Sequence, residues 1–325
     1  MMPFTEHNIY FGDSRKLNKI DDESVQLIVT SPPYWQLKDY GTDNNQTGYN
    51  DSYEDYINNL NLVWTECYRV LREGCRMCVN IGYQFARSAY YGRYKVIPIR
   101  DEIIRYCEAV GFDYMGSIIW QKGNASNKIV EASIMGSYLY PRNGVIKLDY
   151  EYILIFKKLG TAPEISDEIK EESRLTKEEW NKYFYGHWKF SGAKKENNLA
   201  PFPEELPKRL IKMFSFKNET VFDPFLGSGT TSLAALKLER NSVGYELNRE
   251  YKDIIFEKIN SGIAIDCDGI VNIYNDNDSL CIDEKYSESK LIYKYKDFVE
   301  IKRIKDPKEN TYSSVICEDT RKEED

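Results

Sequence analysis

Apolar and β-branched residues gather along the chain in short runs, which are separated by longer amphipathic stretches. Runs of about four to eight such residues between turn residues are typical of strands, whereas apolar residues repeating every third or fourth position are typical of helices. This pattern predicts strands at 8–11, 25–30, 75–81, 114–121, 150–156, 220–222 and 242–245. It predicts helices at 51–71, 94–110, 203–216, 232–238 and 251–259.

Strands that alternate with helices predict parallel pairing, because parallel neighbours need a crossover connection. The strand at 25–30 is apolar at nearly every position, as expected in a sheet that is buried on both faces. Gly74 and Gly111 each follow a predicted helix and act as its end signal. We therefore expect an α/β fold with a doubly wound, mostly parallel sheet.

Two stretches interrupt the alternation. Residues 123–147 are rich in Gly, Asn and Ser, and residues 161–200 are charged and helix-like. Loops this long usually have a function. Beyond about 262 the composition changes to Asp, Asn, Tyr and Lys with alternating apolar positions, which indicates a small β-rich appendage. The predicted units are 1–160, 161–200, 201–261 and 262–325, the last without an assigned role.

A strand, a glycine turn and a helix follow one another between 220 and 238. Gly227 and Gly229 allow the backbone to approach a ligand closely, and Asp223 offers a carboxylate at the strand end. The next strand ends in Glu246, about where dinucleotide-type folds hold ribose hydroxyls. The loop lacks both the Gly-Lys-Ser/Thr ending of a P-loop and the third glycine of a pyrophosphate site. The unit therefore predicts a nucleoside site, unless it is an ordinary turn with a glycine at a helix end.

The second informative stretch is Ser31-Pro32-Pro33-Tyr34-Trp35, directly after the strand at 25–30. Two prolines fix the backbone and donate no hydrogen bonds, so the carbonyls beside them are free to accept. The Ser31 side chain and the Pro32 carbonyl can accept both N–H bonds of an amino group, while Tyr34 offers a face for base stacking. A Pro-Pro turn alone is more often a plain loop, but its combination with the glycine motif indicates a site for an exocyclic amine.

Thr-Ser-Pro-Pro-Tyr-Trp, followed later by Phe-Asp-Pro-Phe-Leu-Gly-Ser-Gly-Thr-Thr, resembles the catalytic and cofactor motifs of the DNA amino-methyltransferases in their β-type order. The resemblance covers about residues 8–260. It implies a Rossmann-like methyltransferase fold, S-adenosyl-L-methionine (SAM) as cofactor and double-stranded DNA as partner. It also implies a target-recognition region at 161–200, with 123–147 as a second contributor, and it leaves a cognate restriction endonuclease and a homodimer open.

The same resemblance implies roles for single residues. The catalytic positions are Ser31, Pro32, Pro33 and Tyr34. The cofactor positions are Asp223, Phe225, Gly227, Gly229, Thr230 and Glu246, together with Asp13, which matches the family's acidic residue near the adenine. In such an enzyme the target base is flipped out of the duplex, and its amine attacks the methyl group directly.

Ser31 favours N4 of cytosine as the methyl acceptor, because the family's adenine enzymes mostly have Asp or Asn at this position. Adenine N6 is the alternative with the same geometry. Methylation of RNA or of a protein glutamine, and a catalytically inactive DNA-binding module, are rivals that the motif order and the two intact motifs disfavour. Carbon-5 methylation of cytosine would need a cysteine in a Pro-Cys context, and no cysteine here follows a proline.

A net charge of −8 argues against a protein that coats nucleic acid non-specifically, although it allows a local basic face. Residues 182–195 contain no acid, and aromatic residues separate their lysines. This composition suits phosphate contacts and base stacking, with a solvated loop whose aromatics enter the core as the equal alternative. The candidate DNA-binding residues are Lys182, Lys189, Lys194 and Lys195.

Cysteine and histidine usage points to reduced thiols and no metal site. Seven cysteines are scattered over the chain, and the Cys75-Arg-Met-Cys78 pair has neither a second pair nor a nearby histidine to complete a zinc site. Cys78 is expected in the core of a strand. No leader and no apolar run of about 18 residues is found, so we expect a cytoplasmic protein without a membrane partner.

Overall fold

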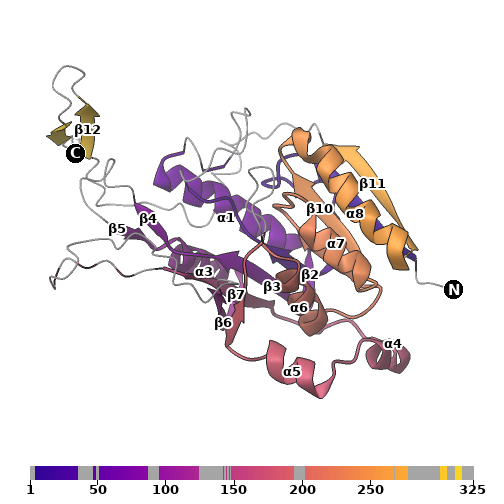
Figure 1. Ribbon diagram of the computed structural model, residues 1–325. Coiled ribbons are helices and arrows are strands. Elements are labelled where there is room, and N and C mark those ends of the chain that lie inside the picture. Colours follow the sequence, from indigo (N-terminus) through magenta and orange to yellow (C-terminus); the bar gives the residue numbers. More distant parts are fainter. Residues whose placement is uncertain are drawn as a thin grey trace.

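A nine-stranded sheet lies at the centre of the computed structural model, in the order β11-β1-β10-β9-β2-β3-β7-β6-β8 (Figure 1). The structure describes residues 4–35, 47–48, 51–86, 95–123, 148–193, 202–266 and 268–276, the single positions 142, 144 and 146, and two strands at 301–305 and 312–316. Within this sheet, only the two pairs that β7 makes with β3 and β6 are antiparallel. The predicted doubly wound, mostly parallel α/β fold is confirmed.

The strands of this sheet are β1 (Phe4–Phe11), β2 (Val25–Thr30), β3 (Leu71–Ile81), β6 (Phe112–Lys122), β7 (Tyr150–Lys158), β8 (His187–Phe190), β9 (Thr220–Asp223), β10 (Asn241–Glu246) and β11 (Asp268–Asn275). Two small antiparallel sheets pair β4 (Gln84–Ala86) with β5 (Lys95–Ile97) and β12 (Ile301–Lys305) with β13 (Tyr312–Ile316). The helices are α1 (Tyr53–Val70), α3 (Ile99–Val110), α4 (Asp167–Glu172), α5 (Lys177–Tyr183), α6 (Glu205–Phe214), α7 (Thr230–Lys237) and α8 (Lys252–Asp266), with a 3₁₀ turn at Arg249–Tyr251.

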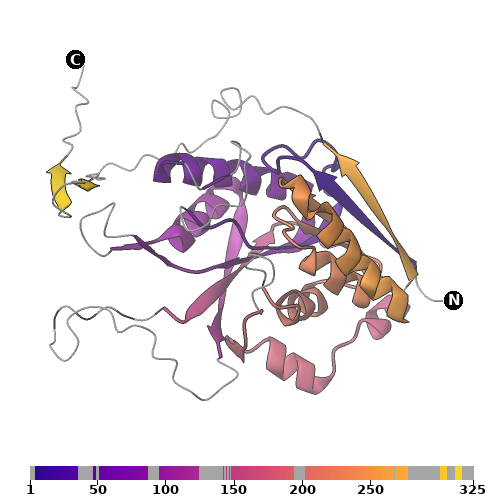
Figure 2. The ribbon, with the colours of Figure 1, turned by 45° about the horizontal axis from the view of Figure 1, so that its top comes forward.

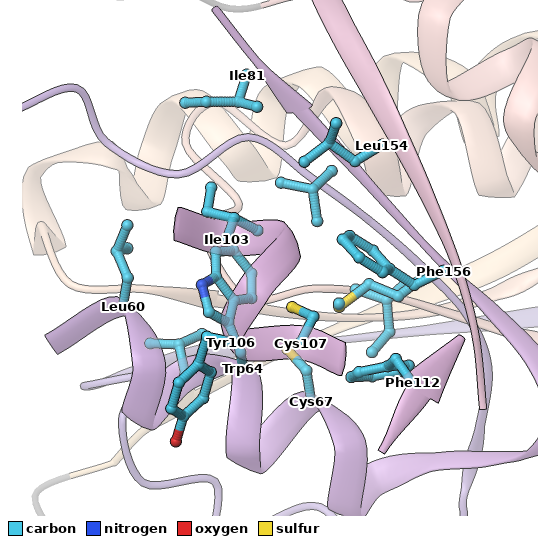
Figure 3. Packing of buried hydrophobic residues seen from close by; sticks show 14 of the residues in the cluster. Leu60, Trp64, Cys67, Ile81, Ile103, Tyr106, Cys107, Phe112, Leu154 and Phe156 are labelled. Carbon is cyan, nitrogen blue, oxygen red and sulfur yellow. The ribbon is translucent and has the colours of Figure 1, made fainter. Parts of the chain in front are cut away.

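Helices cover both faces of the sheet (Figure 2). Alternate strand residues point to opposite faces, so apolar residues on each face pack against a different set of helices. Ile28 of β2 belongs to the cluster beneath α1 and α3, whereas Leu27 and Val29 belong to the cluster beneath α6 and α7. Figure 3 shows the first cluster, in which side chains of α1 and α3 such as Trp64 and Ile103 meet the sheet. α8 packs beside α7 over β1.

The helix predicted at 51–71 ends earlier than its glycine signal. α1 starts after Ser52, whose side chain accepts from the Asp55 N–H over 3.1 Å, and it ends at Val70. Gly74 lies inside β3 with φ +75°, and a Cβ there would be 2.3 Å from the Ala162 backbone nitrogen. Gly74 is therefore a point of close approach between two segments and not a helix end.

The helix predicted at 94–110 begins five residues later than expected. Residues 95–97 form β5, and Pro98 stands at the N-cap of α3. The residue before a proline is biased toward extended backbone, which explains why residue 97 stays in β5 and α3 begins only after Pro98. The predicted end is confirmed, because Gly111 has φ 127° and its N–H bonds the last carbonyls of α3.

Strands from two outlying segments extend the central sheet. β8, within the 161–200 interval, pairs in parallel with β6 at one edge. β11 pairs in parallel with β1 along its whole length at the other edge, and α8 continues to Asp266. The sheet thus reaches residue 275, past the end near 261 that the composition change indicated, because the alternating apolar residues of 269–274 pack on α8 and β1.

Candidate active site

A cavity of about 160 Å³ opens at the carboxyl ends of four neighbouring parallel strands, β1, β10, β9 and β2. Open α/β sheets place ligands at this edge, because loops from adjacent strands meet there. The cavity is lined by Gly12, Asp13, Ser14, Ser31, Pro32, Pro33, Tyr34, Thr47, Phe202, Pro224, Phe225, Leu226, Gly227, Ser228, Thr230, Tyr245, Glu246, Leu247 and Tyr251. The two sequence motifs therefore meet at one site.

The two glycines of the loop after β9 have different surroundings. Gly227 lines the cavity with φ +55°, and a Cβ there would meet nothing closer than the Phe225 carbonyl at 4.0 Å. Gly229, with φ +83°, precedes α7, and a Cβ there would lie 3.3 Å from Cγ2 of Ile255. Gly227 is thus the position where backbone borders the cavity, whereas Gly229 faces α8.

Glu246 stands at the end of β10, on the rim of the cavity. Its Oε2 accepts from the Gly227 N–H and its Oε1 from the Asn248 N–H, each over 2.8 Å. The Leu247 N–H also bonds this carboxylate, so only part of its about four acceptor positions remains for a ligand. Burial raises the pKa of Glu246 to about 7, because these backbone donors only partly replace lost water.

Asp223 is buried behind the loop and is absent from the cavity wall. Its Oδ1 accepts from Thr30 Oγ1 over 2.7 Å and from the Phe225 N–H over 3.0 Å, while its Oδ2 accepts from Thr231 Oγ1 over 2.6 Å. Burial raises its pKa to about 6 against the lowering effect of these bonds. Asp223 therefore ties β2, the cofactor loop and α7 together.

Asp13 lines the cavity after β1, but a buried arginine already occupies its carboxylate. Arg15 Nη2 lies 2.5 Å from Oδ2, and Arg15 Nε bonds both oxygens over 3.0 Å. Arg15 Nη1 also donates to Oδ1 of Asn59 in α1 over 2.7 Å. This chain of contacts fixes the turn after β1 to α1 beside the cavity.

The loop after β2 is held from several sides. Tyr56 of α1 donates to the Pro33 carbonyl over 2.8 Å, and Trp35 Nε1 donates to the Asp51 carbonyl over 2.9 Å. Tyr34 Oη donates to Oε1 of Glu151 over 2.8 Å. Among the residues that the structure describes, no hydrogen bond occupies Ser31 Oγ or the Pro32 carbonyl. The loop is therefore held firmly, and no described residue occupies its two predicted acceptors.

Two residues at or beside the site, Tyr245 and Lys258, were not predicted from the sequence. Thr230, which lines the cavity, was predicted, but Lys258 of α8 was not. Lys258 does not line the cavity itself, and its Nζ contacts Ser228 Oγ over 2.6 Å and Thr230 Oγ1 over 3.4 Å. Tyr245 lines the cavity, and its hydroxyl donates to Asp276 over 3.0 Å. A residue beside a predicted strand end, such as Tyr245, could have been proposed from the sequence, whereas Lys258 could not.

The described part of the segment 182–195, in which lysines alternate with aromatic residues, is partly buried in the core and partly exposed to solvent. Tyr183 and Trp188 are buried, and Trp188 Nε1 donates to the Tyr183 carbonyl over 3.0 Å. Lys182 reaches Glu205 at 3.9 Å, and Lys189 is exposed on β8. Neither of these two lysines lines the cavity. The other two candidates, Lys194 and Lys195, lie outside the described residues.

Two further findings concern the described part of the chain alone. No group of three or more His, Cys, Asp and Glu side chains is arranged there to hold a metal ion. None of its helices is long and apolar enough to cross a membrane. Cys78 is a free thiol in β3, and it is buried in the cluster beneath α6 and α7, as predicted.

The cavity suits a nucleoside attached to an amino acid, as in SAM. Phe225, Leu226 and Tyr251 provide apolar walls, Glu246 offers a carboxylate at the rim, and Gly227 leaves the backbone open. The hydroxyls of Ser228 and Thr230, which line the cavity beside the start of α7, add donors for a carboxylate. These features meet what the cofactor's three parts require.

Comparison with known proteins gives consistent results. The DNA methylase model of the N6/N4 methyltransferases matches residues 25–257. M.MjaI, a type II methyltransferase of Methanocaldococcus jannaschii, is 41% identical over 284 residues, which are 78% of this chain and 91% of that protein. M.MthZI, a type II methyltransferase of Methanothermobacter thermautotrophicus, is 33% identical over 320 residues, covering 90% and 87% respectively.

A solved structure supports the same assignment. TTHA0409 of Thermus thermophilus, a candidate DNA modification methylase complexed with S-adenosyl-L-methionine, superimposes with a TM-score of 0.68. It is 32% identical, and the alignment covers 84% of this chain and all of that one. The chain belongs to the N6/N4 DNA methylase family, and SAM is its cofactor.

Proposed function

We propose that this DNA methyltransferase transfers the methyl group of SAM to N4 of a cytosine that is flipped out of the duplex. The observation that carries the proposal is the pair of acceptors at the cavity, Ser31 Oγ and the Pro32 carbonyl, which no described residue occupies. An amino group has two N–H donors, and two fixed acceptors match them. Tyr34 lines the cavity beside this pair and offers an aromatic face to the base.

Bound SAM supplies an electrophilic methyl group on a sulfonium sulfur. Ser31 and Pro32 hold the target amine by its N–H bonds, which turns the nitrogen lone pair away from them and toward the cofactor. Because Tyr56 donates to the adjacent Pro33 carbonyl, the backbone that carries the Pro32 carbonyl keeps its direction. No covalent bond between enzyme and base is needed, and the surplus proton of the methylated amine leaves to solvent.

Within the cofactor site we assign the ribose hydroxyls to Glu246, the adenine to the walls formed by Phe225 and Tyr251, and the close backbone approach to Gly227. Thr230, with Lys258 beside it, provides donors for the methionine carboxylate. Asp13, Asp223 and Gly229 act indirectly, since their side chains or backbone hold the loops that line the cavity.

The choice of cytosine over adenine depends on Ser31. A neutral hydroxyl can both donate to the ring nitrogen beside the amine and accept from the amine, and it suits the smaller pyrimidine. The test is mass spectrometry of nucleosides from DNA that the purified protein has methylated. We expect N4-methylcytosine, and N6-methyladenine as the only product would overturn the choice of base.

The roles of the loop residues are tested in the same assay. Ser31→Ala and Tyr34→Ala should lose product while they retain SAM binding measured by calorimetry, whereas Ser24→Ala, on an exposed turn, should keep both. Unchanged product formation in Ser31→Ala would contradict the assignment of this hydroxyl.

We further infer that the protein methylates one specific site and serves as the protective partner of a restriction endonuclease. The support is the similarity to M.MjaI and M.MthZI, which are type II methyltransferases. The interval 161–200 is proposed to contact the DNA, because it presents Lys182, Lys189 and Tyr185 to solvent at one edge of the sheet. Methylome sequencing of cells expressing the protein would identify the site.

A further inference from the structure

Glu151 collects three donors at the edge of the candidate active site. Its Oε1 accepts from Tyr34 Oη over 2.8 Å and its Oε2 from Asn80 Nδ2 over 2.8 Å. Lys122 Nζ forms an ion pair with Oε1. The residue is only 8% exposed, so its oxygens have little access to solvent and obtain their hydrogen bonds from these partners.

The three partners come from different parts of the chain. Asn80 is on β3 and Lys122 on β6, the two strands that flank β7, which carries Glu151. Tyr34 follows β2, and 117 positions separate it from Glu151. The described lining of the cavity includes no residue of β3, β6 or β7. The hydrogen bond between the Tyr34 hydroxyl and Glu151 therefore links β3, β6 and β7 to the catalytic loop after β2.

The carboxylate has little freedom to move. A Cβ added at Gly82 would lie 3.0 Å from Cγ of Glu151, so backbone passes directly against the side chain. On its other side Lys122 Nζ lies 5.2 Å from the Trp120 ring centre, and Trp120 is directly opposite Glu151 in the sheet. An acceptor that is fixed in this way defines where the Tyr34 hydroxyl must be.

We propose that Glu151 is a positioning residue for Tyr34. The hydrogen bond at the far end of the Tyr34 ring fixes where the ring axis points. Because a phenolic O–H prefers to lie in the plane of its ring, the position of the acceptor also favours one orientation of the ring face before any base arrives. Lys122 and Asn80 keep the Glu151 carboxylate oriented. This inference rests on the proposed function, in which the Tyr34 ring stacks on the flipped base.

A double-variant cycle in the full-length protein tests the inference. Glu151→Leu, Glu151→Gln and Tyr34→Phe are compared with Tyr34→Phe/Glu151→Leu and Tyr34→Phe/Glu151→Gln, with Glu168→Leu on the exposed start of α4 as control. The readouts are kcat, KM for DNA, SAM affinity and the midpoint of thermal unfolding. Glu151→Gln keeps an oxygen that can accept from the tyrosine, so it is the conservative variant.

We expect Tyr34→Phe and Glu151→Leu each to lower kcat by roughly 10- to 100-fold, the effect of losing one hydrogen bond to a charged group. The double variants should be no slower than Tyr34→Phe alone, since Glu151 acts through the hydroxyl that this variant lacks. SAM affinity should stay within about twofold, and Glu151→Gln should recover most of the rate.

Losses that multiply in the double variants would overturn the inference, as would a Glu151→Gln protein as slow as Glu151→Leu. If Glu151→Leu fails to fold, the test uses Glu151→Gln and Tyr34→Phe alone. An unchanged kcat in Tyr34→Phe would then show that the Tyr34 hydroxyl has no role in catalysis, which would overturn the inference. Failure of the proposed function looks different: Tyr34→Ala would then keep full activity, or the unaltered protein would form no methylated amine.

Discussion

The backbone N–H of Gly227 donates to Oε2 of Glu246 over 2.8 Å. This bond connects the glycine loop after β9 to the end of β10, so the two features that the sequence placed in one cofactor motif are in direct contact. It also leaves the carboxylate partly satisfied before a cofactor binds. The protonation of Glu246 should therefore control how well the pocket accepts ribose hydroxyls.

SAM should bind more tightly as the pH rises from about 6 to 8. Burial raises the pKa of Glu246 to about 7, so below this pH the carboxyl holds a proton and loses an acceptor position. Each pH unit below the pKa should weaken binding by up to about tenfold, with a plateau above it. Calorimetry on Glu246→Gln should show weak binding without this slope, and Glu250→Gln should behave like the unaltered protein. A slope that persists in Glu246→Gln would place the titrating group elsewhere.

Valine at Gly227 and at Gly229 should have different consequences. Both positions have positive φ, so each substitution carries backbone strain of about 1–2 kcal/mol. At Gly229 the side chain also meets Ile255, at 3.3 Å from the Cβ, so the unfolding midpoint should fall further. At Gly227 the side chain projects into the cavity, so SAM affinity should fall most. Calorimetry and thermal unfolding of both variants measure this, and the reverse ranking would show that the loop assignment is wrong.

Asp223→Asn should be more stable than the unaltered protein at pH 8 and should still bind SAM. Burial raises the pKa of Asp223 from 3.8 to about 6, so the stability linked to its proton is fully present below pH 3.8 and is lost as the pH rises through 6. The free energy of unfolding should therefore rise in the variant by on the order of 3 kcal/mol at pH 8, with no gain near pH 4.

Asn can keep the bonds to Thr30 and Phe225, and Thr231 can turn its hydroxyl to accept from the new amide. Asp223→Ala leaves all three partners unsatisfied and serves as the destabilised comparison. Urea unfolding at both pH values gives the stabilities. Loss of SAM binding in a stable Asp223→Asn protein would show that the carboxylate touches the cofactor after all.

Features that depend only on the order of neighbouring elements along the chain could be predicted from the sequence. A strand followed by Gly-x-Gly and a helix, and a strand followed by Pro-Pro, place their loops at one sheet edge, so Ser31, Gly227 and Glu246 could be predicted to meet. The contact of Tyr34 with Glu151 could not, because it depends on β7 entering the sheet beside β3 in antiparallel register. The inward direction of Asp223 likewise depends on Thr30 of a neighbouring strand.

Removal of charge at Lys189 should weaken DNA binding and reduce its salt dependence. The ammonium is on the exposed face of β8, next to the buried Trp188, so β8 itself should remain in place in Lys189→Ala. If Lys189 contacts one phosphate, the slope of log affinity against log salt concentration should fall by about 0.9, because one fewer counterion is released.

Lys182→Ala should act in the same way but more weakly, since Glu205 at 3.9 Å already offsets part of its charge. Lys170→Ala on α4, where Asp167 lies 3.1 Å away, is the matched control and should leave the slope unchanged. Fluorescence anisotropy with a labelled duplex at several salt concentrations measures all three, and an unaltered slope in Lys189→Ala would return the segment to a solvated edge strand without a role in DNA binding.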